Sequence, residues 1–233
     1  MAVAVETRDL CRRFGRRWAL AHLDLSVAPG ERLLVVGANG SGKTTLLSLL
    51  STLLAPSQGA LHIDGVDVSR EPERVRGMVG MVSHSPGLYE DLSGRDNLMV
   101  QARMLGCPVD LGLLARVGLE DRPDPVRNYS AGMRKRLSFA LLLLKGPRLT
   151  LLDEPFAQLD PSGMDQVARL IREIPGTVVV ASHQVVRASA LCDRALVLER
   201  GLPRWQGPAS QAWDAWRVVY GEGAEAGTDD VPR

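Results

Sequence analysis

A glycine-rich stretch near the start of the chain constrains its fold more than any other feature. It consists of Gly37, Ala38, Asn39, Gly40, Ser41, Gly42, Lys43, Thr44 and Thr45. The run Arg32–Val36 before it is rich in leucine and valine, which predicts a buried strand of a parallel sheet. The leucine-rich segment 46–50 after it predicts a helix. Glycine, four residues and then Gly-Lys-Thr, placed between a strand and a helix, is typical of a phosphate-binding loop.

The residue types of this loop suit a bound polyphosphate and a metal ion. Its glycines let the backbone curl with the amides pointing inward, and the N-terminus of the following helix adds partial positive charge. The ammonium of Lys43 can neutralise the β- and γ-phosphates, and the hydroxyl of Thr44 can coordinate Mg²⁺.

Two adjacent carboxylates, Asp153 and Glu154, follow a second apolar run over 149–152, which predicts another strand. Neighbouring strand residues point to opposite sides, so the two acids can take separate roles where the strand ends. We expect Asp153 to hold Mg²⁺ through water and Glu154 to act as general base toward an attacking water. Alone this pattern is weak, but beside a phosphate-binding loop it is specific.

Strands and helices alternate on either side of a purely helical stretch, which predicts an α/β domain with a mainly parallel sheet and a helical insertion. The predicted strands cover 3–10, 20–27, 32–36, 60–63, 78–82, 149–152, 177–181 and 195–199. The later helices are expected at 110–117, 131–145, 162–174, 185–191 and 210–220, and a further helix runs from Ser93 to Met104. We assign 1–83 and 148–205 to the α/β core that carries the phosphate-binding loop, and 84–147 to the helical subdomain. A C-terminal helix then covers 206–220, and 221–233 is expected to be a disordered tail.

Charge and hydropathy narrow the class of partner. The chain has 28 Lys and Arg against 27 Asp and Glu, so no overall charge draws it to nucleic acid, and we expect no nucleic-acid partner. No apolar run reaches the ~18 to 20 residues that cross a bilayer, and the N-terminus lacks the pattern of a signal peptide. We therefore expect a cytosolic chain that cannot span a membrane by itself.

Two further segments leave alternatives open. Tyr-Ser-Ala-Gly-Met at 129–133 opens a helix with Ser130 placed as its N-cap. It is either a plain helix start or a second anion site, used on the nucleotide of another subunit. Trp213, Trp216 and Tyr220 share one side of the predicted C-terminal helix, which either packs back onto the core or docks a partner.

Together these motifs resemble the ATP-binding subunits of ABC transporters over about residues 5–205. The family signature, usually Leu-Ser-Gly-Gly-Gln, is similar to 129–133, where Ser130 and Gly132, the positions that face phosphate, are kept. The dipeptide Ser182-His183 resembles the switch histidine of the family, and 158–160 resembles the loop that signals between the two sites. Phe14 is similar to the aromatic residue that stacks on adenine.

The resemblance implies a P-loop NTPase core of the RecA type with an antiparallel β edge, and ATP and Mg²⁺ as ligands. It implies that Glu154 and His183 are catalytic. Two copies would sandwich two ATP molecules, with Ser130 and Gly132 of one chain closing over the γ-phosphate held by the other. Integral membrane subunits would be the further partners, at the cytoplasmic face of the cell membrane.

His84 departs from the family pattern, because it stands where the loop between core and insertion usually has glutamine. Imidazole can bind a water or an oxygen linked to Mg²⁺, although it titrates near neutrality. We therefore expect His84 to take part in the site. With Ser-Ala-Gly at 130–132, Asp-Glu-Pro-Phe at 153–156 and Ser-His-Gln at 182–184, this departure is similar to the haem-exporter ATPases of cytochrome c maturation.

Four alternative functions stay open. ABC ATPases that export drugs, ions or polysaccharides share several of these features. A soluble ABC ATPase acting on ribosomes or DNA usually carries two ATPase units or a long coiled-coil insertion, and neither is evident. A kinase for a small molecule would leave the 129–133 motif and His183 without a role. A binding module without catalysis is disfavoured because Glu154 and His183 are both present.

Overall fold

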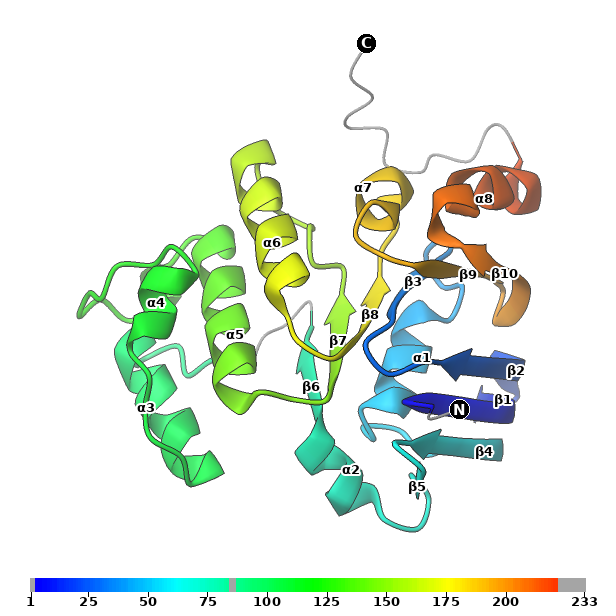
Figure 1. Ribbon diagram of the computed structural model, residues 1–233, viewed down its shortest axis with the longest axis horizontal. Helices are drawn as coiled ribbons and strands as arrows, with labels where there is room; N and C mark the ends of the chain where they lie inside the picture. Colours follow the sequence, from blue (N-terminus) through cyan, green and yellow to red (C-terminus); the bar gives the residue numbers. More distant parts are fainter. Residues whose placement is uncertain (1–2, 84–86, 222–233) are drawn as a thin grey trace.

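The computed structural model describes residues 3–83 and 87–221, and residues 1–2, 84–86 and 222–233 lie outside the described part. Figure 1 shows strands in the middle and on one side of the molecule, with helices packed against them. The strands are β1 (Val5–Phe14), β2 (Arg17–Val27), β3 (Arg32–Val36), β4 (Gln58–Ile63), β5 (Val66–Asp67), β6 (Val79–Val82), β7 (Leu149–Asp153), β8 (Thr177–Ala181), β9 (Arg194–Glu199) and β10 (Leu202–Pro208). The helices are α1 (Lys43–Leu50), α2 (Pro72–Met78), α3 (Gly94–Leu105), α4 (Gly112–Arg116), α5 (Ala131–Lys145), α6 (Pro161–Glu173), α7 (Val185–Ser189) and α8 (Ala212–Tyr220).

The larger sheet has the strand order β10-β9-β3-β8-β7-β6. Its strands are parallel except for β10, which pairs antiparallel with β9 at the edge. Because the strands are parallel, β3 and β7 both end at the same edge of the sheet. This topology brings the glycine-rich loop after β3 next to the acids at the end of β7, as the sequence predicts for an α/β fold.

The larger sheet is covered on both faces, because alternate residues of β3 enter two different cores. Leu34 and Val36 belong to the cluster that contains Phe139 of α5, whereas Leu33 and Val35 belong to the cluster formed with the leucines of α1. All of these side chains are fully buried. Burial on both faces explains why the strand reads as a continuous apolar run and not as an alternating one.

The antiparallel strands form a separate sheet and not only an edge of the main one. Its strand order is β2-β1-β4-β5, and every pairing in it is antiparallel. Strand β1 is longer than predicted and reaches Phe14, which places that ring at the end of a β1–β2 hairpin. The predicted adenine contact is therefore held by a paired strand.

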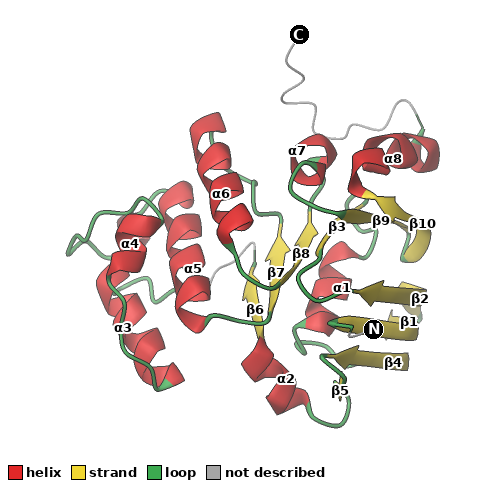
Figure 2. Cartoon of the chain, viewed as in Figure 1, coloured by secondary structure: helices red, strands yellow, loops and turns green. Residues whose placement is uncertain are grey.

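Helices α3, α4 and α5 gather at one end of the molecule, away from the antiparallel sheet (Figure 2). Ser93 caps α3, since its hydroxyl accepts a hydrogen bond from the Asp96 amide at 3.1 Å. Ser130 caps α5 in the same way, with the Met133 amide at 3.2 Å. Both predicted N-caps are confirmed.

Two strands and one α-helix of the described residues were not predicted, because each lacks a strong apolar period. Strand β10 contains two prolines and one glycine and is an edge strand, where proline is tolerated. Helix α2 buries a single residue, Val75, and β5 is two residues long. The predicted C-terminal helix over 206–220 starts too early, since 206–208 end β10 and α8 begins at Ala212.

Helix α8 packs back onto the core, which is the first of the two alternatives for this segment. Trp216 and Ala212 are buried in the cluster that the larger sheet forms with α5 and α6.

Among the described residues, no helix combines the length and the apolarity that a bilayer crossing requires.

Candidate active site

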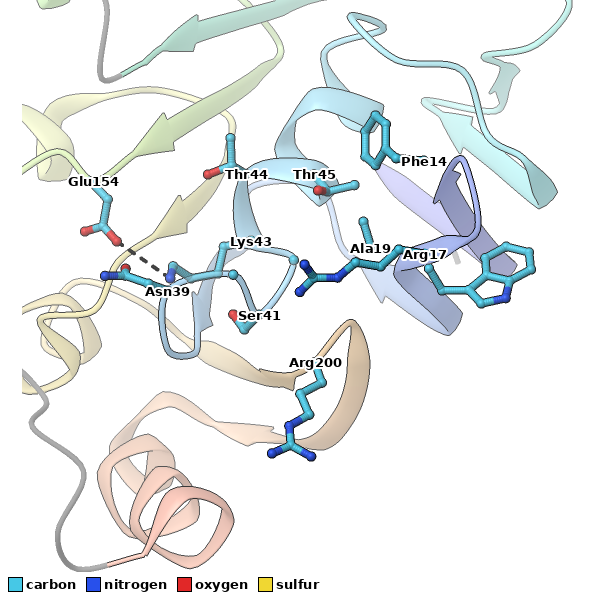
Figure 3. A pocket seen from close by; sticks show the side chains of 13 residues that line it. Phe14, Arg17, Ala19, Asn39, Ser41, Lys43, Thr44, Thr45, Glu154 and Arg200 are labelled. Atoms are coloured by element: carbon cyan, nitrogen blue, oxygen red, sulfur yellow. Dashed lines mark ion pairs between the residues drawn. The ribbon is translucent and has the colours of Figure 1, made fainter.

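The glycine-rich loop opens on a pocket of about 750 Å³ between the hairpin end of the antiparallel sheet and the end of β7 (Figure 3). The residues that line the pocket are Phe14, Arg17, Trp18, Ala19, Asn39, Gly40, Ser41, Gly42, Lys43, Thr44, Thr45, Glu154 and Arg200. Phe14 and Glu154 lie at opposite ends of it. The pocket therefore gathers most of the predicted phosphate loop, the predicted adenine contact and the predicted general base.

The loop needs glycine at two positions for steric reasons. Gly42 has φ 108°, and a Cβ there would come within 2.7 Å of the Ala19 carbonyl oxygen. A Cβ at Gly37 would come within 2.4 Å of the Leu198 carbonyl oxygen. No larger residue fits at either place without moving the backbone. The curl of the loop is thus built into the sequence.

Lys43, the first residue of α1, lies folded back over the loop. Its Nζ donates to the carbonyl oxygens of Gly37 at 2.8 Å and Ala38 at 3.3 Å, and lies 3.8 Å from Oε1 of Glu154. Burial lowers the pKa of the ammonium, and the charges of Glu154 and Asp153 partly offset this shift. An anionic ligand in the pocket would stabilise the charged form in the same way.

Thr44 and Asp153 lie together at the start of α1 and the end of β7. The Thr44 hydroxyl donates to Oδ2 of Asp153 at 3.0 Å. Within the described part of the chain, Oδ1 of Asp153 is buried and has no hydrogen-bond partner. Burial raises the pKa of this carboxyl group. A buried carboxylate oxygen without a partner, beside a hydroxyl, fits the oxygen ligands that Mg²⁺ takes.

Glu154 follows β7 in a left-handed backbone conformation, with φ 47°. Its Oε2 accepts from the Ser182 hydroxyl and the His183 amide, each at 3.3 Å, and lies 2.8 Å from His183 Nδ1. Lys135 of α5 donates to the Glu154 carbonyl oxygen at 3.3 Å. The carboxylate is therefore fixed through one oxygen, and its other oxygen faces Lys43.

Ser130 and Gly132 lie apart from this site. They line a second pocket of about 410 Å³, with Gln158 and Asp160 among its other walls, and the two pockets share no lining residue. The sequence motif at 158–160 thus meets the signature motif in space. Within one chain the structure does not bring either motif to the phosphate loop.

Four residues that line the pocket were not predicted from the sequence, namely Arg17, Trp18, Ala19 and Arg200. Arg17 and Trp18 begin β2, where Arg17 pairs with Phe14 and Trp18 with Arg13, so their closeness to Phe14 in the sequence was the available signal. Phe14 itself is 48% exposed, with the Arg12 guanidinium 4.8 Å from its ring centroid. His84, the predicted substitute for glutamine, lies outside the described residues.

Comparison with known proteins finds the ABC transporter family model and ATP-binding proteins of export and resistance systems. Residues 20–157 match the protein-family model described as ABC transporter. A cytochrome c biogenesis ATP-binding export protein, CcmA 2 of Cupriavidus metallidurans, is 40% identical over 87% of this chain and all of that protein. The daunorubicin resistance ATP-binding protein DrrA3 of Streptomyces coeruleorubidus is 39% identical over 86% of this chain, but the match covers 66% of that protein.

A solved structure agrees with the fold. CbiO1 of Clostridium perfringens, described as part of an ABC transporter complex, superposes with a TM-score of 0.81 at 25% identity, and the match covers 94% of each chain. The match includes both sheets and the helical insertion, since it leaves so little of either chain uncovered.

Proposed function

Because this chain belongs to the ABC transporter family as an ATP-binding subunit, we propose that it hydrolyses ATP as one half of a dimer and drives export through separate membrane subunits. The observation that carries this proposal is the division of the site. Lys43 and Glu154 line one pocket, whereas Ser130 and Gly132 line another. A site divided in this way is completed by a second chain.

In the proposed complex the phosphates of ATP occupy the glycine-rich loop, and Phe14 stacks on the adenine. The ammonium of Lys43 then breaks its hydrogen bonds to the carbonyl oxygens of Gly37 and Ala38 and donates to phosphate oxygens, which are the stronger acceptors. Mg²⁺ held by Thr44 and Asp153 would neutralise charge on the phosphates.

Glu154 acts as general base in this proposal. Its Oε2 is held by His183 and Ser182, so the carboxylate cannot turn freely. Its Oε1 is the oxygen that faces the phosphate loop and can accept a proton from the attacking water. His183 positions the base and reaches the γ-phosphate.

Replacing Asp153 with asparagine tests the proposed metal contact. We expect turnover to fall about 100-fold and the Mg²⁺ concentration for half-maximal rate to rise, because the charge that favours the cation is lost. The measurement is a Mg²⁺ titration of ATPase rate. Asp165→Asn, which removes an exposed acid paired with Arg187, is the matched control. An unchanged Mg²⁺ dependence in Asp153→Asn would exclude this contact.

Two copies of the chain satisfy the division of the site by two-fold symmetry. The phosphate loop of each copy then faces Ser130 and Gly132 of the other, and the same contact is made twice. ATP stabilises the dimer because both chains contact its charge, and loss of the γ-phosphate weakens the contact. The free amides at the N-terminus of α5, beside Ser130, suit the γ-phosphate.

For the cargo we propose haem export in cytochrome c maturation, with the chain at the cytoplasmic face of the cell membrane and no nucleic-acid partner. The support is the match to CcmA 2 along its whole length, together with the motifs around Ser130 and His183. Drug export is the second candidate, because DrrA3 is nearly as similar in identity.

Identification of the membrane partners tests the cargo. The tagged chain would be purified from detergent-solubilised membranes of its own organism, and the integral membrane proteins bound to it identified by mass spectrometry. The ATPase rate of that complex in liposomes would then be compared with haem, with daunorubicin and without either. Stimulation by haem alone is expected. Stimulation by daunorubicin would favour drug export, and absence of any membrane partner would contradict a transport role.

A further inference from the structure

The last residue of α8, Tyr220, contacts the phosphate loop but is not among the residues that line the pocket. The hydroxyl of Tyr220 accepts a hydrogen bond from the backbone amide of Ala38 at 3.0 Å. The same hydroxyl donates to the carbonyl oxygen of Leu198 in β9. One side chain therefore joins the C-terminal helix, the loop and the main sheet, although Ala38 and Tyr220 are 182 residues apart in the sequence.

The Tyr220 ring is held in place by an aromatic stack along α8. The rings of Trp213 and Trp216 are stacked with centroids 5.6 Å apart, and those of Trp216 and Tyr220 lie 5.2 Å apart at a tilt of 31°. Trp216 is 4% exposed and belongs to the main core. Aromatic side chains have few rotamers, so a stack anchored in this way fixes the position of the hydroxyl.

The hydroxyl can make both hydrogen bonds at neutral pH. Burial raises the pKa of Tyr220, and hence the group keeps its proton and can donate while it accepts. Because the Ala38 amide is directed at this oxygen, the amides that cradle phosphate come from the later residues of the loop, between Asn39 and Thr45.

Other contacts of the loop hold different parts of it. The Gly201 amide donates to the Ser41 carbonyl oxygen at 2.9 Å, which ties the middle of the loop to the β9–β10 turn. The ammonium of Lys43 donates to the carbonyl oxygens of Gly37 and Ala38, and we expect bound ATP to break those two hydrogen bonds. When Lys43 leaves, the first turn of the loop keeps the hydrogen bond from the Ser41 amide to the Ala38 carbonyl oxygen at 3.1 Å and the contact with Tyr220, and of these two only the Tyr220 contact ties the turn to another element.

We propose that Tyr220 is a positioning residue for the phosphate loop, so that the C-terminal helix is a working part of the nucleotide site. This inference rests on the proposed ATP binding. It gives the aromatic side of α8 a role that is separate from partner docking. The helix places one hydroxyl within hydrogen-bond distance of the Ala38 amide, and the tryptophan stack holds the Tyr220 ring in that position.

Tyr220→Phe removes the hydroxyl and keeps the ring. We expect the Kd and KM for ATP to rise roughly threefold to tenfold, the loss typical of one hydrogen bond, while kcat at saturating ATP stays within about twofold. Val219→Ala is the matched control, because Val219 packs the same helix against the core and belongs neither to the aromatic stack nor to the contact with the loop. It should lower the melting temperature by a similar amount and leave ATP affinity unchanged.

Hydrogen exchange provides a measurement that does not depend on ATP. In the nucleotide-free chain, the Ala38 amide should exchange faster in Tyr220→Phe than in the wild type, and at the wild-type rate in Val219→Ala. Unchanged exchange in Tyr220→Phe, or an equal loss of ATP affinity in both variants, would overturn the inference. If the wild type itself binds no ATP, the proposed function fails, and the exchange result still decides the role of Tyr220.

Discussion

Replacing Glu154 with glutamine should stop ATP turnover while leaving ATP bound. A general base contributes about 10² to 10⁴ in rate, and glutamine of the same shape cannot take a proton. The amide keeps a donor and an acceptor for Ser182 and His183, so the fold around it should persist. Removing a negative charge 3.8 Å from Lys43 also favours phosphate binding. ATP should therefore accumulate on the protein, and with it the dimer.

Two measurements on purified protein check this result. Single-turnover hydrolysis gives the chemical rate, and light scattering after size exclusion gives the mass with ATP, with ADP and without nucleotide. Glu173→Gln is the matched control, because Glu173 is an exposed acid paired with Arg116 at the end of α6. It should hydrolyse ATP at the wild-type rate. Wild-type turnover in Glu154→Gln would remove Glu154 from the role of base.

The parts of the site that could be predicted depend on single residue types or on contacts between residues close together in the sequence. The glycines at 37–42 are required by close approaches and by left-handed backbone, and such requirements appear directly as residue type. The acids at the end of β7 could be placed near the loop because parallel strands end at a common edge. Ser93 and Ser130 were identified as caps because capping is a contact over three residues.

The parts that could not be predicted depend on contacts between distant residues. Nothing in the segment around Tyr220 indicates that its hydroxyl meets the amide of Ala38, since the contact exists only after β9 and α8 have packed. Arg200 enters the pocket because the β9–β10 turn places it there, and β10 itself has no apolar period. Lys135 was seen only as part of a helix, yet it donates to the Glu154 backbone across two elements.

Replacing Lys43 with alanine should remove tight ATP binding and leave the fold intact. A charged hydrogen bond to phosphate contributes about 1.5 to 3 kcal/mol, so we expect a loss of roughly 100-fold in affinity. The ammonium is buried, and burial disfavours its charged form. Its removal therefore relieves a desolvation cost, and the melting temperature of the nucleotide-free variant should stay close to that of the wild type.

One thermal-shift experiment measures both the loss of ATP binding and the stability of the nucleotide-free variant. The wild type should gain stability as ATP is added, in proportion to the logarithm of its concentration, whereas Lys43→Ala should show no gain in the same range. Lys43→Arg should not restore it, because a planar fork does not fit where a compact ammonium reaches the Gly37 carbonyl oxygen. Lys145→Ala is the control, since that ammonium donates to the carbonyl oxygens of Arg76 and Val79, outside the pocket that holds Lys43. Its loss should lower stability without changing ATP affinity. Full ATP stabilisation of Lys43→Ala would mean that phosphate binds elsewhere, and the assignment of the loop would then be wrong.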